Sequence, residues 1–135
     1  MLLPRISTNV SVWPADPDGD PLGRFLASLA PFEALPPQTL VLPSHGLPFR
    51  GIPMRVAQLR AHHDARLAEL CEAIAASPAP VTAADMLPVR FRRQLDVQQR
   101  FFAMGEAIAH LNYLWHRRRV ARLRDADGSY RFAIH

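Results

Sequence analysis

Hydrophobic positions recur at helical intervals over most of the second half of the chain. From residue 52 onward, steps of three and four connect Val56, Leu59, His63, Leu67, Leu70 and Ile74. This spacing predicts a long amphipathic helix from Pro53 to about Ala76, because one face of a helix repeats every three to four residues. The same reasoning predicts a helix from about Leu95 to Arg119. Its apolar stripe, which we expect to face the core, consists of Phe101, Met104, Ile108, Leu111 and Trp115.

Two local signals predict the elements that flank the second of these helices. Thr82-Ala-Ala-Asp85 has the form of a capping box and predicts a short helix that runs to about Phe91. Near the end of the chain, Asp127-Gly128 supplies a tight turn, which predicts a β-hairpin. The apolar positions that alternate around this turn are Leu123, Tyr130, Phe132 and Ile134. Three helices followed by a hairpin is the order of a winged-helix module, which we assign to residues 52–135.

The first 51 residues have a different pattern, in which strand-like segments lie on both sides of a helix. Period-two alternation predicts a strand over Arg5–Trp13. Helical spacing predicts a helix over Leu22–Leu35 with Asp20 as its N-cap, and Pro31 should end or kink it. Thr39–Leu42 predicts a short second strand. The expected fold class is therefore α+β, mainly α with minor β, and residues 1–51 form a strand-helix-strand (βαβ) remnant too small to fold alone.

Composition places the chain among single-domain proteins of ordinary solubility. The 135 residues are 49% hydrophobic and 21% charged, and no apolar stretch approaches the roughly 20 residues that a membrane span needs. The opening MLLPRIS lacks the long apolar stretch of an export signal. A single cysteine, Cys71, cannot form an internal disulfide, and we expect it to be buried and structural. These features predict a cytoplasmic protein with no membrane partner.

Positive charge gathers in the C-terminal part of the chain. All sixteen basic residues are arginines. Residues 81–135 carry ten of them against five acids, whereas residues 1–80 carry six against seven acids. An arginine-rich winged helix could contact nucleic-acid phosphates. Acidic residues interrupt the patch, however, so we do not expect nucleic-acid binding; they are Asp96, Glu106, Asp125 and Asp127.

Several stretches of the sequence together resemble a known family. LVLPSHG, residues 40–46, resembles the last metal-ligand motif of metallo-β-lactamase-fold hydrolases. PFRGIPMRVAQLRAHHDARLAEL, VTAADML and GEAIAHLNYL resemble the helical C-terminal extension of a bacterial subgroup of that superfamily. The resemblance covers essentially the whole chain in the right order. It implies that residues 1–51 are the C-terminal remnant of an αββα sandwich and that residues 52–135 form a winged-helix-like domain bordering the substrate cleft.

The resemblance also assigns one metal ligand. His45 matches the final histidine of the family, which binds one of two metals, usually zinc, and Gly46 is free to adopt a positive φ that aims the ring into a site. The HxHxDH motif and the middle histidine of the family are absent. A catalytic zinc needs three protein ligands, so we expect this chain alone to bind metal poorly and to be inactive. The parent enzyme would hydrolyse an ester, thioester, lactam or phosphoester.

Other polar residues have structural interpretations. His62 and His63 are adjacent on one helix, so their side chains diverge by about 100° and cannot hold one metal together. The i, i+4 spacing of Glu106 and His110 indicates a polar pair along the helix. Ser44 precedes His45, but neighbours in a strand point to opposite faces and no orienting acid is nearby. We therefore expect no catalytic residue and no cofactor-binding residue besides the metal ligand His45.

The most direct interpretation is the C-terminal portion of a metal-dependent hydrolase, present as a truncated gene product or an excised piece. The implied partner is the missing N-terminal metallo-β-lactamase domain. Without that domain the two expected strands would have open edges, which predicts a homodimer or strand exchange through these segments, or disorder before about residue 36. The alternative, from another class of function, is a stand-alone winged-helix module that binds nucleic acid or a protein partner.

Overall fold

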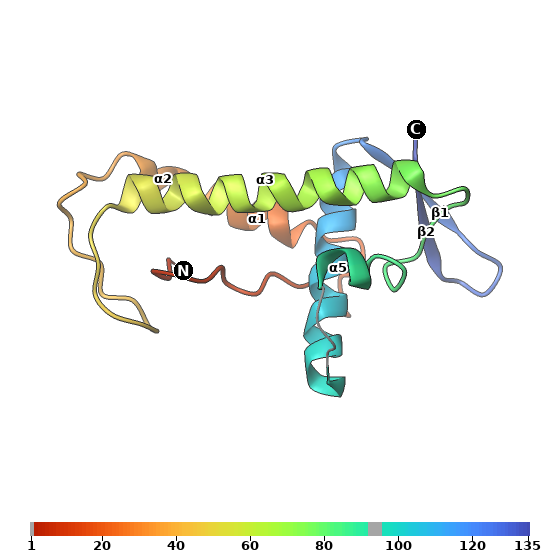
Figure 1. Ribbon diagram of the computed structural model, residues 1–135, viewed down its shortest axis with the longest axis horizontal. Coiled ribbons are helices and arrows are strands. Elements are labelled where there is room, and N and C mark those ends of the chain that lie inside the picture. Colours follow the sequence, from red (N-terminus) through yellow and green to blue (C-terminus); the bar gives the residue numbers. More distant parts are fainter. Residues whose placement is uncertain (1, 92–95) are drawn as a thin grey trace.

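The computed structural model describes residues 2–91 and 96–135 and is an α+β arrangement of helices and one antiparallel hairpin. The elements, in chain order, are α1 (Pro21–Ser28), α2 (Ala30–Glu33), α3 (Ile52–Ala76), α4 (Leu87–Arg90), α5 (Val97–His116), β1 (Val120–Arg124) and β2 (Tyr130–Ile134). In Figure 1, α3 runs along the long axis of the molecule and α5 crosses it. The hairpin lies at one end of α3 and the loop before α3 lies at the other.

The long helix α3 confirms the helix that hydrophobic spacing predicts. Its buried residues form the expected stripe: Ile52, Val56, Leu59, His63, Leu67, Leu70 and Ile74. Pro53 lies in the first turn, where a missing backbone N–H has no consequence. The helices α2, α4 and α5 and the strand β2 pack against α3, and Phe25 of α1 contacts it through His63, so this helix organises the core.

The predicted helix over residues 22–35 is divided into α1 and α2. The Asp20 side chain accepts a hydrogen bond of 2.8 Å from the Gly23 N–H, which confirms the N-cap. Pro31 interrupts the helix as expected, because it has no N–H to donate and its ring clashes with the preceding turn. Leu22, Leu26 and Leu29 point into the core from this segment.

The two strands predicted in the first 51 residues are wrong. Among the described residues, β1 and β2 are the only strands, and Val41 forms just an isolated antiparallel bridge with Phe49. Residues 4–6 form a bend and residues 7–13 are irregular, and no described strand lies beside them to complete a ladder. Alternation alone cannot make a strand, because a strand needs a hydrogen-bonding neighbour. The βαβ remnant is therefore absent from residues 1–51 as the structure describes them.

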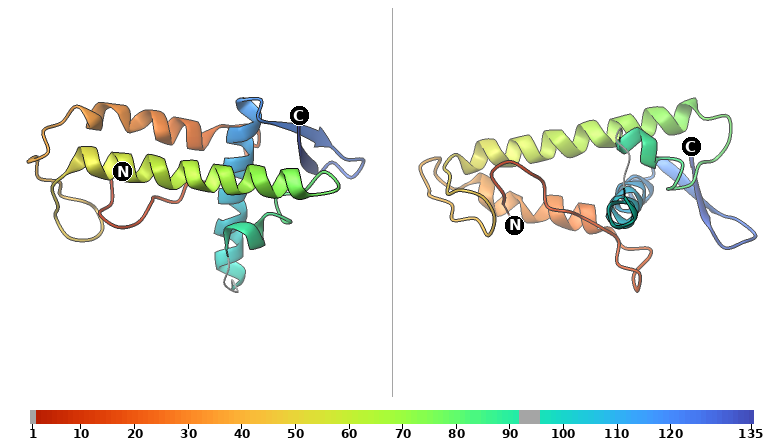
Figure 2. Two further views of the ribbon diagram at one scale, coloured as in Figure 1. Left: turned by 45° about the horizontal axis from the view of Figure 1, so that its top comes forward. Right: turned by 60° about the horizontal axis from the view of Figure 1, so that its bottom comes forward.

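The N-terminal segment instead binds to helices. In the right-hand view of Figure 2 it runs between α3 and α1 toward α5. The Arg55 guanidinium on α3 donates to the carbonyl oxygens of Leu3 at 2.7 Å and Ile6 at 3.0 Å. Further along, the segment crosses α5 at Gly105, where a Cβ would lie 2.9 Å from the side chain of Ser11. Residues 2–35 thus have packing partners within the chain, while the homodimer stays a prediction.

Buried histidines connect this segment to α3 and α5. Nε2 of His63 lies 3.1 Å from the Ser7 hydroxyl, and Nδ1 of His63 lies 3.2 Å from Nε2 of His110. Nδ1 of His110 lies 2.8 Å from the carbonyl oxygen of Glu106. Since a carbonyl only accepts, His110 donates there, and with neutral rings His63 donates to His110 through Nδ1. The Ser7 hydroxyl lies between the remaining Nε2 of His63 and the Thr8 carbonyl oxygen, to which it donates at 3.2 Å. His110 thus bonds the backbone of Glu106 one turn earlier, and the predicted side-chain pair of these two residues stays a prediction. His62 is exposed, as its divergence from His63 requires.

The C-terminal elements follow the expected order, with one shorter helix. Thr82 and Asp85 form reciprocal hydrogen bonds, but α4 begins only at Leu87. Pro88 explains the difference, because proline fits the first turn of a helix but not the interior of one starting at residue 82. α5 has a complete capping box between Asp96 and Gln99, and the predicted start at Leu95 lies outside the described residues. The hairpin is confirmed, while the winged-helix assignment stays a prediction.

We expect replacement of His110 by leucine to lower the free energy of unfolding by about 1–3 kcal/mol, since it leaves buried donors and acceptors on α3 and α5 without their partner. Urea denaturation followed by circular dichroism measures this change. The matched control is His62→Leu, at the exposed neighbouring position, which should change stability by less than about 0.5 kcal/mol. Equal losses in both variants would contradict a stabilising role for the histidine contact.

The turn before α4 should make stability depend on pH. Hydrogen bonds from the backbone N–H and the hydroxyl of Thr82 hold the pKa of Asp85 below its usual value. A lowered folded-state pKa stabilises the protein above the unfolded-state pKa of about 3.9, and this contribution is lost as the pH falls through the folded-state pKa. The destabilisation caused by Asp85→Ala should therefore be smaller at about pH 2 than at about pH 7. Urea denaturation of both proteins at the two pH values measures this difference, and an equal destabilisation at both would contradict it.

Candidate functional site

His45 lies in an exposed loop at one end of the molecule. Two backbone hydrogen bonds between Val41 and Phe49, of 2.8 and 3.2 Å, close the base of this loop. Gly46 has a φ of 89°, which confirms the positive φ that the sequence predicts. A Cβ on Gly46 would lie 2.8 Å from Cγ of Pro4, so the loop also touches the N-terminal segment. The loop is therefore closed at its base and braced at its tip, and it presents the imidazole outward.

The described residues do not complete a metal site around His45. No group of three or more His, Cys, Asp or Glu residues among residues 2–91 and 96–135 could hold a metal ion. A catalytic zinc requires three protein ligands, and one imidazole does not fit that requirement. The role of His45 as a metal ligand stays a prediction, and no reaction step can be assigned to this chain alone.

Some of the arginines near the hairpin form ion pairs with carboxylates. Arg117 binds Asp20 at 2.8 Å, and Arg122 binds Asp18 at 2.7 Å. The Arg122 guanidinium also lies 3.6 Å from the ring centre of Trp115 and 4.1 Å from that of Tyr130. These contacts leave the Arg122 side chain only 8% exposed, so it holds the loop of residues 14–20 against the hairpin.

Other arginines of the basic surface are either paired with a carboxylate or exposed to solvent. The hydrogen bond and charge of Asp125 raise the pKa of Arg131, which forms an ion pair with it. Arg118 and Arg119 are exposed after α5. Arg92 and Arg93, which the sequence places before the third helix, lie outside the described residues. Three arginines of the proposed patch are thus neutralised, which weakens the case for a phosphate-binding face.

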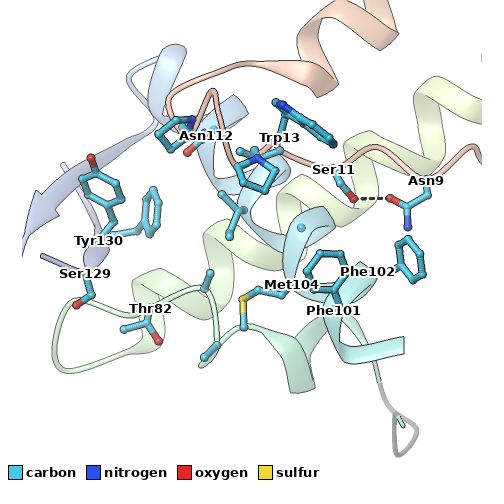
Figure 3. A pocket seen from close by; sticks show the side chains of 18 residues that line it. Asn9, Ser11, Trp13, Thr82, Phe101, Phe102, Met104, Asn112, Ser129 and Tyr130 are labelled. Atoms are coloured by element: carbon cyan, nitrogen blue, oxygen red, sulfur yellow. Dashed lines mark hydrogen bonds between the residues drawn. The ribbon is translucent and has the colours of Figure 1, made fainter. Parts of the chain in front are cut away.

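A large apolar groove lies beside α5, and sequence reasoning missed it (Figure 3). Its volume is about 1040 Å³. Phe101, Met104 and Ile108 line it, so the expectation that this stripe faces the core is wrong for these three residues. The core side of α5 consists instead of Ala103, Ala107, Ala109, His110, Leu111 and Leu114. The sequence signal for this orientation was the recurrence of alanines on one face of the helix, which is the buried face, and the presence of two adjacent phenylalanines outside it.

A second, smaller hollow lies near the His45 loop. Its volume is about 470 Å³, and its lining includes Leu2, Phe32, Leu35, Leu40, Leu42, Ser44 and Ile52. Several apolar side chains at this end are exposed to solvent, with Leu42 at 75% and Leu47 at 78%. Apolar side chains this exposed, next to a histidine, are a feature of surfaces that contact another protein or domain.

None of the described helices has both the length and the apolar character that crossing a bilayer requires.

Comparisons with known proteins identify relatives of this chain. The family model described as metallo-beta-lactamase-like, C-terminal domain, matches residues 67–135. A beta-lactamase domain protein from Burkholderia ambifaria, known from its crystal structure, is 52% identical with a TM-score of 0.93, and the match covers 99% of this chain and 39% of that one. No curated protein matches significantly.

A second solved structure extends the relationship. A metallo-beta-lactamase family protein from Thermus thermophilus is 30% identical with a TM-score of 0.79, and the match covers 99% of this chain and 40% of that one. The chain therefore spans about two fifths of the length of each of these two relatives. The match to the family model over residues 67–135 shows that this chain belongs to the metallo-beta-lactamase-like family, whose C-terminal domain it carries.

Proposed function

We propose that this chain acts as the C-terminal portion of a metal-dependent hydrolase, to which it contributes His45 as the last metal ligand. The observation that carries the proposal is that His45 is exposed on a loop whose apolar side chains are also exposed to solvent. The chain in which it lies spans about two fifths of the length of its relatives. The metal we propose is zinc. When bound, such a metal supplies a water of lowered pKa and polarises the bond to be broken.

The chain's own residues would position one ligand and support the rest of the fold. Gly46 and the Val41–Phe49 bridge orient the loop, and Pro4 braces its tip. The remaining ligands have to come from outside the described residues, because His45 alone does not fit a metal site. We infer that the chain by itself is not catalytically competent.

The apolar surface at the His45 end supports a specific partner. Leu40, Leu42 and Leu47 are 51%, 75% and 78% exposed, and burying such side chains favours association. We propose that the remainder of the metallo-β-lactamase fold covers this face and that α3 and α5 border the resulting substrate cleft. The length of the two relatives beyond the matched part provides the segment that would do so.

The ligand role of His45 can be tested by metal analysis. The 135-residue chain, loaded with zinc and desalted, should retain well under one zinc per chain. A chimera in which residues 1–135 replace the matching part of the Burkholderia ambifaria protein should retain zinc, and His45→Ala should lower its content, as measured by inductively coupled plasma mass spectrometry.

His62→Ala is the matched control for this experiment, because it removes an exposed imidazole from α3 without touching the loop. The proposal fails if the His45→Ala chimera retains as much zinc as the His62→Ala chimera.

The alternative is a stand-alone module that binds nucleic acid. It has little structural support, because ion pairs with aspartates engage Arg117, Arg122 and Arg131, which would otherwise be available to bind phosphates. We expect no retention of labelled DNA or RNA on nitrocellulose at about 50 mM salt, where phosphate contacts are strong. Retention at this salt that disappears at about 200 mM salt would favour the alternative over the hydrolase proposal.

A further inference from the structure

The groove beside α5 has a long, straight floor. Phe101, Met104, Gly105, Ile108 and Asn112 line it from α5, and steps of three and four place them on one helix face. Eleven residues separate the first from the last, which corresponds to about 16 Å along the helix axis. The groove is therefore elongated along α5.

Its walls come from segments far apart in the sequence. Residues 11–14 form one wall where the N-terminal segment crosses α5, with the Val12 N–H donating to the Gly105 carbonyl oxygen at 3.2 Å. Thr82 before α4, together with Ser129 and Tyr130 of the hairpin, lies on the opposite side (Figure 3). Ala83, Ala84 and Phe132 from the same two segments also line the groove. The bridge between Val81 and Phe132 holds these two parts of the wall together.

The residues that line the groove do not favour a charged ligand. None of the described residues that line the groove carries a charged side chain, and its polar members are Asn9, Ser11, Thr82, Asn112, Ser129 and Tyr130. The amide of Asn112 already donates to the carbonyl oxygens of Pro17 and Gly19 at 2.9 and 3.0 Å. A charged group placed among apolar walls would lose its hydration without gaining an ion pair. The groove thus suits an uncharged ligand.

Aromatic side chains at the edge of the groove are exposed to solvent. Trp13 is 72% exposed, Phe101 71% and Phe102 48%, and the two phenylalanine rings meet edge to face with centres 5.9 Å apart. Large exposed rings beside a concave apolar surface indicate a binding site, since a bound apolar molecule would remove them from water. The volume of about 1040 Å³ lies at the upper end of the range for small-molecule sites.

The groove is separate from the face that surrounds His45. It shares no lining residue with the hollow at that end, which is lined by Leu2, Phe32, Leu35, residues 39–44 and Ile52. The contact proposed above for the remainder of the metallo-β-lactamase fold involves the His45 face, whereas the groove lies along α5, which we place at the border of the proposed substrate cleft. The inference below stands independently of the metal-site proposal.

We propose that this groove binds an uncharged molecule with an extended aliphatic chain, such as a long-chain alcohol or acyl ester. The straight floor along α5 matches a linear chain better than a compact ring system, and the uncharged lining matches a neutral molecule. The hydroxyls of Ser11, Thr82 and Ser129 already donate to Asn9, Asp85 and Asp127 at 2.6, 2.8 and 2.7 Å. Their oxygens can still accept a hydrogen bond from a ligand hydroxyl, and the Asn9 amide can donate to an ester carbonyl.

The test uses the 135-residue chain and dodecanol carrying a terminal bromine, which quenches tryptophan fluorescence on contact. Trp13 lines the groove and Trp115 does not. We expect saturable quenching, its loss in Trp13→Phe, and competition by methyl dodecanoate more strongly than by sodium dodecanoate. Phe101→Glu, a change at an exposed position, should weaken binding about tenfold or more by placing a charge at the site.

Met54→Glu is the matched control, since Met54 is 65% exposed at the start of α3 and lies outside the groove. Ala84→Trp, which fills the groove from an exposed position, should also weaken binding, and thermal melts confirm that the variants are folded. The proposal is overturned by non-saturable quenching or by equal affinity in Phe101→Glu and Met54→Glu. It is also overturned if sedimentation shows a dimer that Phe101→Glu dissociates, because a second copy would then occupy the groove.

Discussion

The contact between His63 and His110 is the point at which the main elements of this chain meet. Both rings are almost completely buried, and the 3.2 Å separation between their nitrogens joins α3 to α5 where the helices cross. Ser7 adds the N-terminal segment, and the edge of Phe25 adds α1 with its ring centre 5.6 Å from that of His63. Polar groups buried this deeply must be paired, so the crossing geometry is constrained by hydrogen bonds as well as by apolar packing.

The position of the N-terminal segment follows from this crossing. Ser7 and Arg55 fix residues 3–7 along α3, and the segment then passes over α5 at Gly105. Its course determines two features at opposite ends of the molecule. Pro4 braces the loop that carries His45, while residues 11–14 form a wall of the groove beside α5. The segment therefore links two candidate sites that share no residue.

The sequence predicted the elements whose signals are local. The stripe of α3, the Asp20 cap, the break at Pro31 and the hairpin turn all depend on residues within a few positions of one another, and all were confirmed. The predicted strand over residues 5–13 failed because alternation describes an extended chain equally well whether or not a neighbouring strand exists. The meeting of His63 with His110, 47 residues apart, has no local signal. The apolar stripe of α5 identified a helix face but could not show that its first half lies beside a groove rather than in the core.

Arg122 has a consequence for how molecules could reach that groove. Its guanidinium is stacked between Trp115 and Tyr130 and paired with Asp18, while Arg117 pairs with Asp20. These contacts fasten the loop of residues 14–20 to the hairpin at the C-terminal end of α5. Separating them would expose a nearly buried cation and break two ion pairs at once, so this part of the groove wall should open rarely. A molecule that enters the groove would more readily pass beside the exposed rings of Phe101 and Phe102.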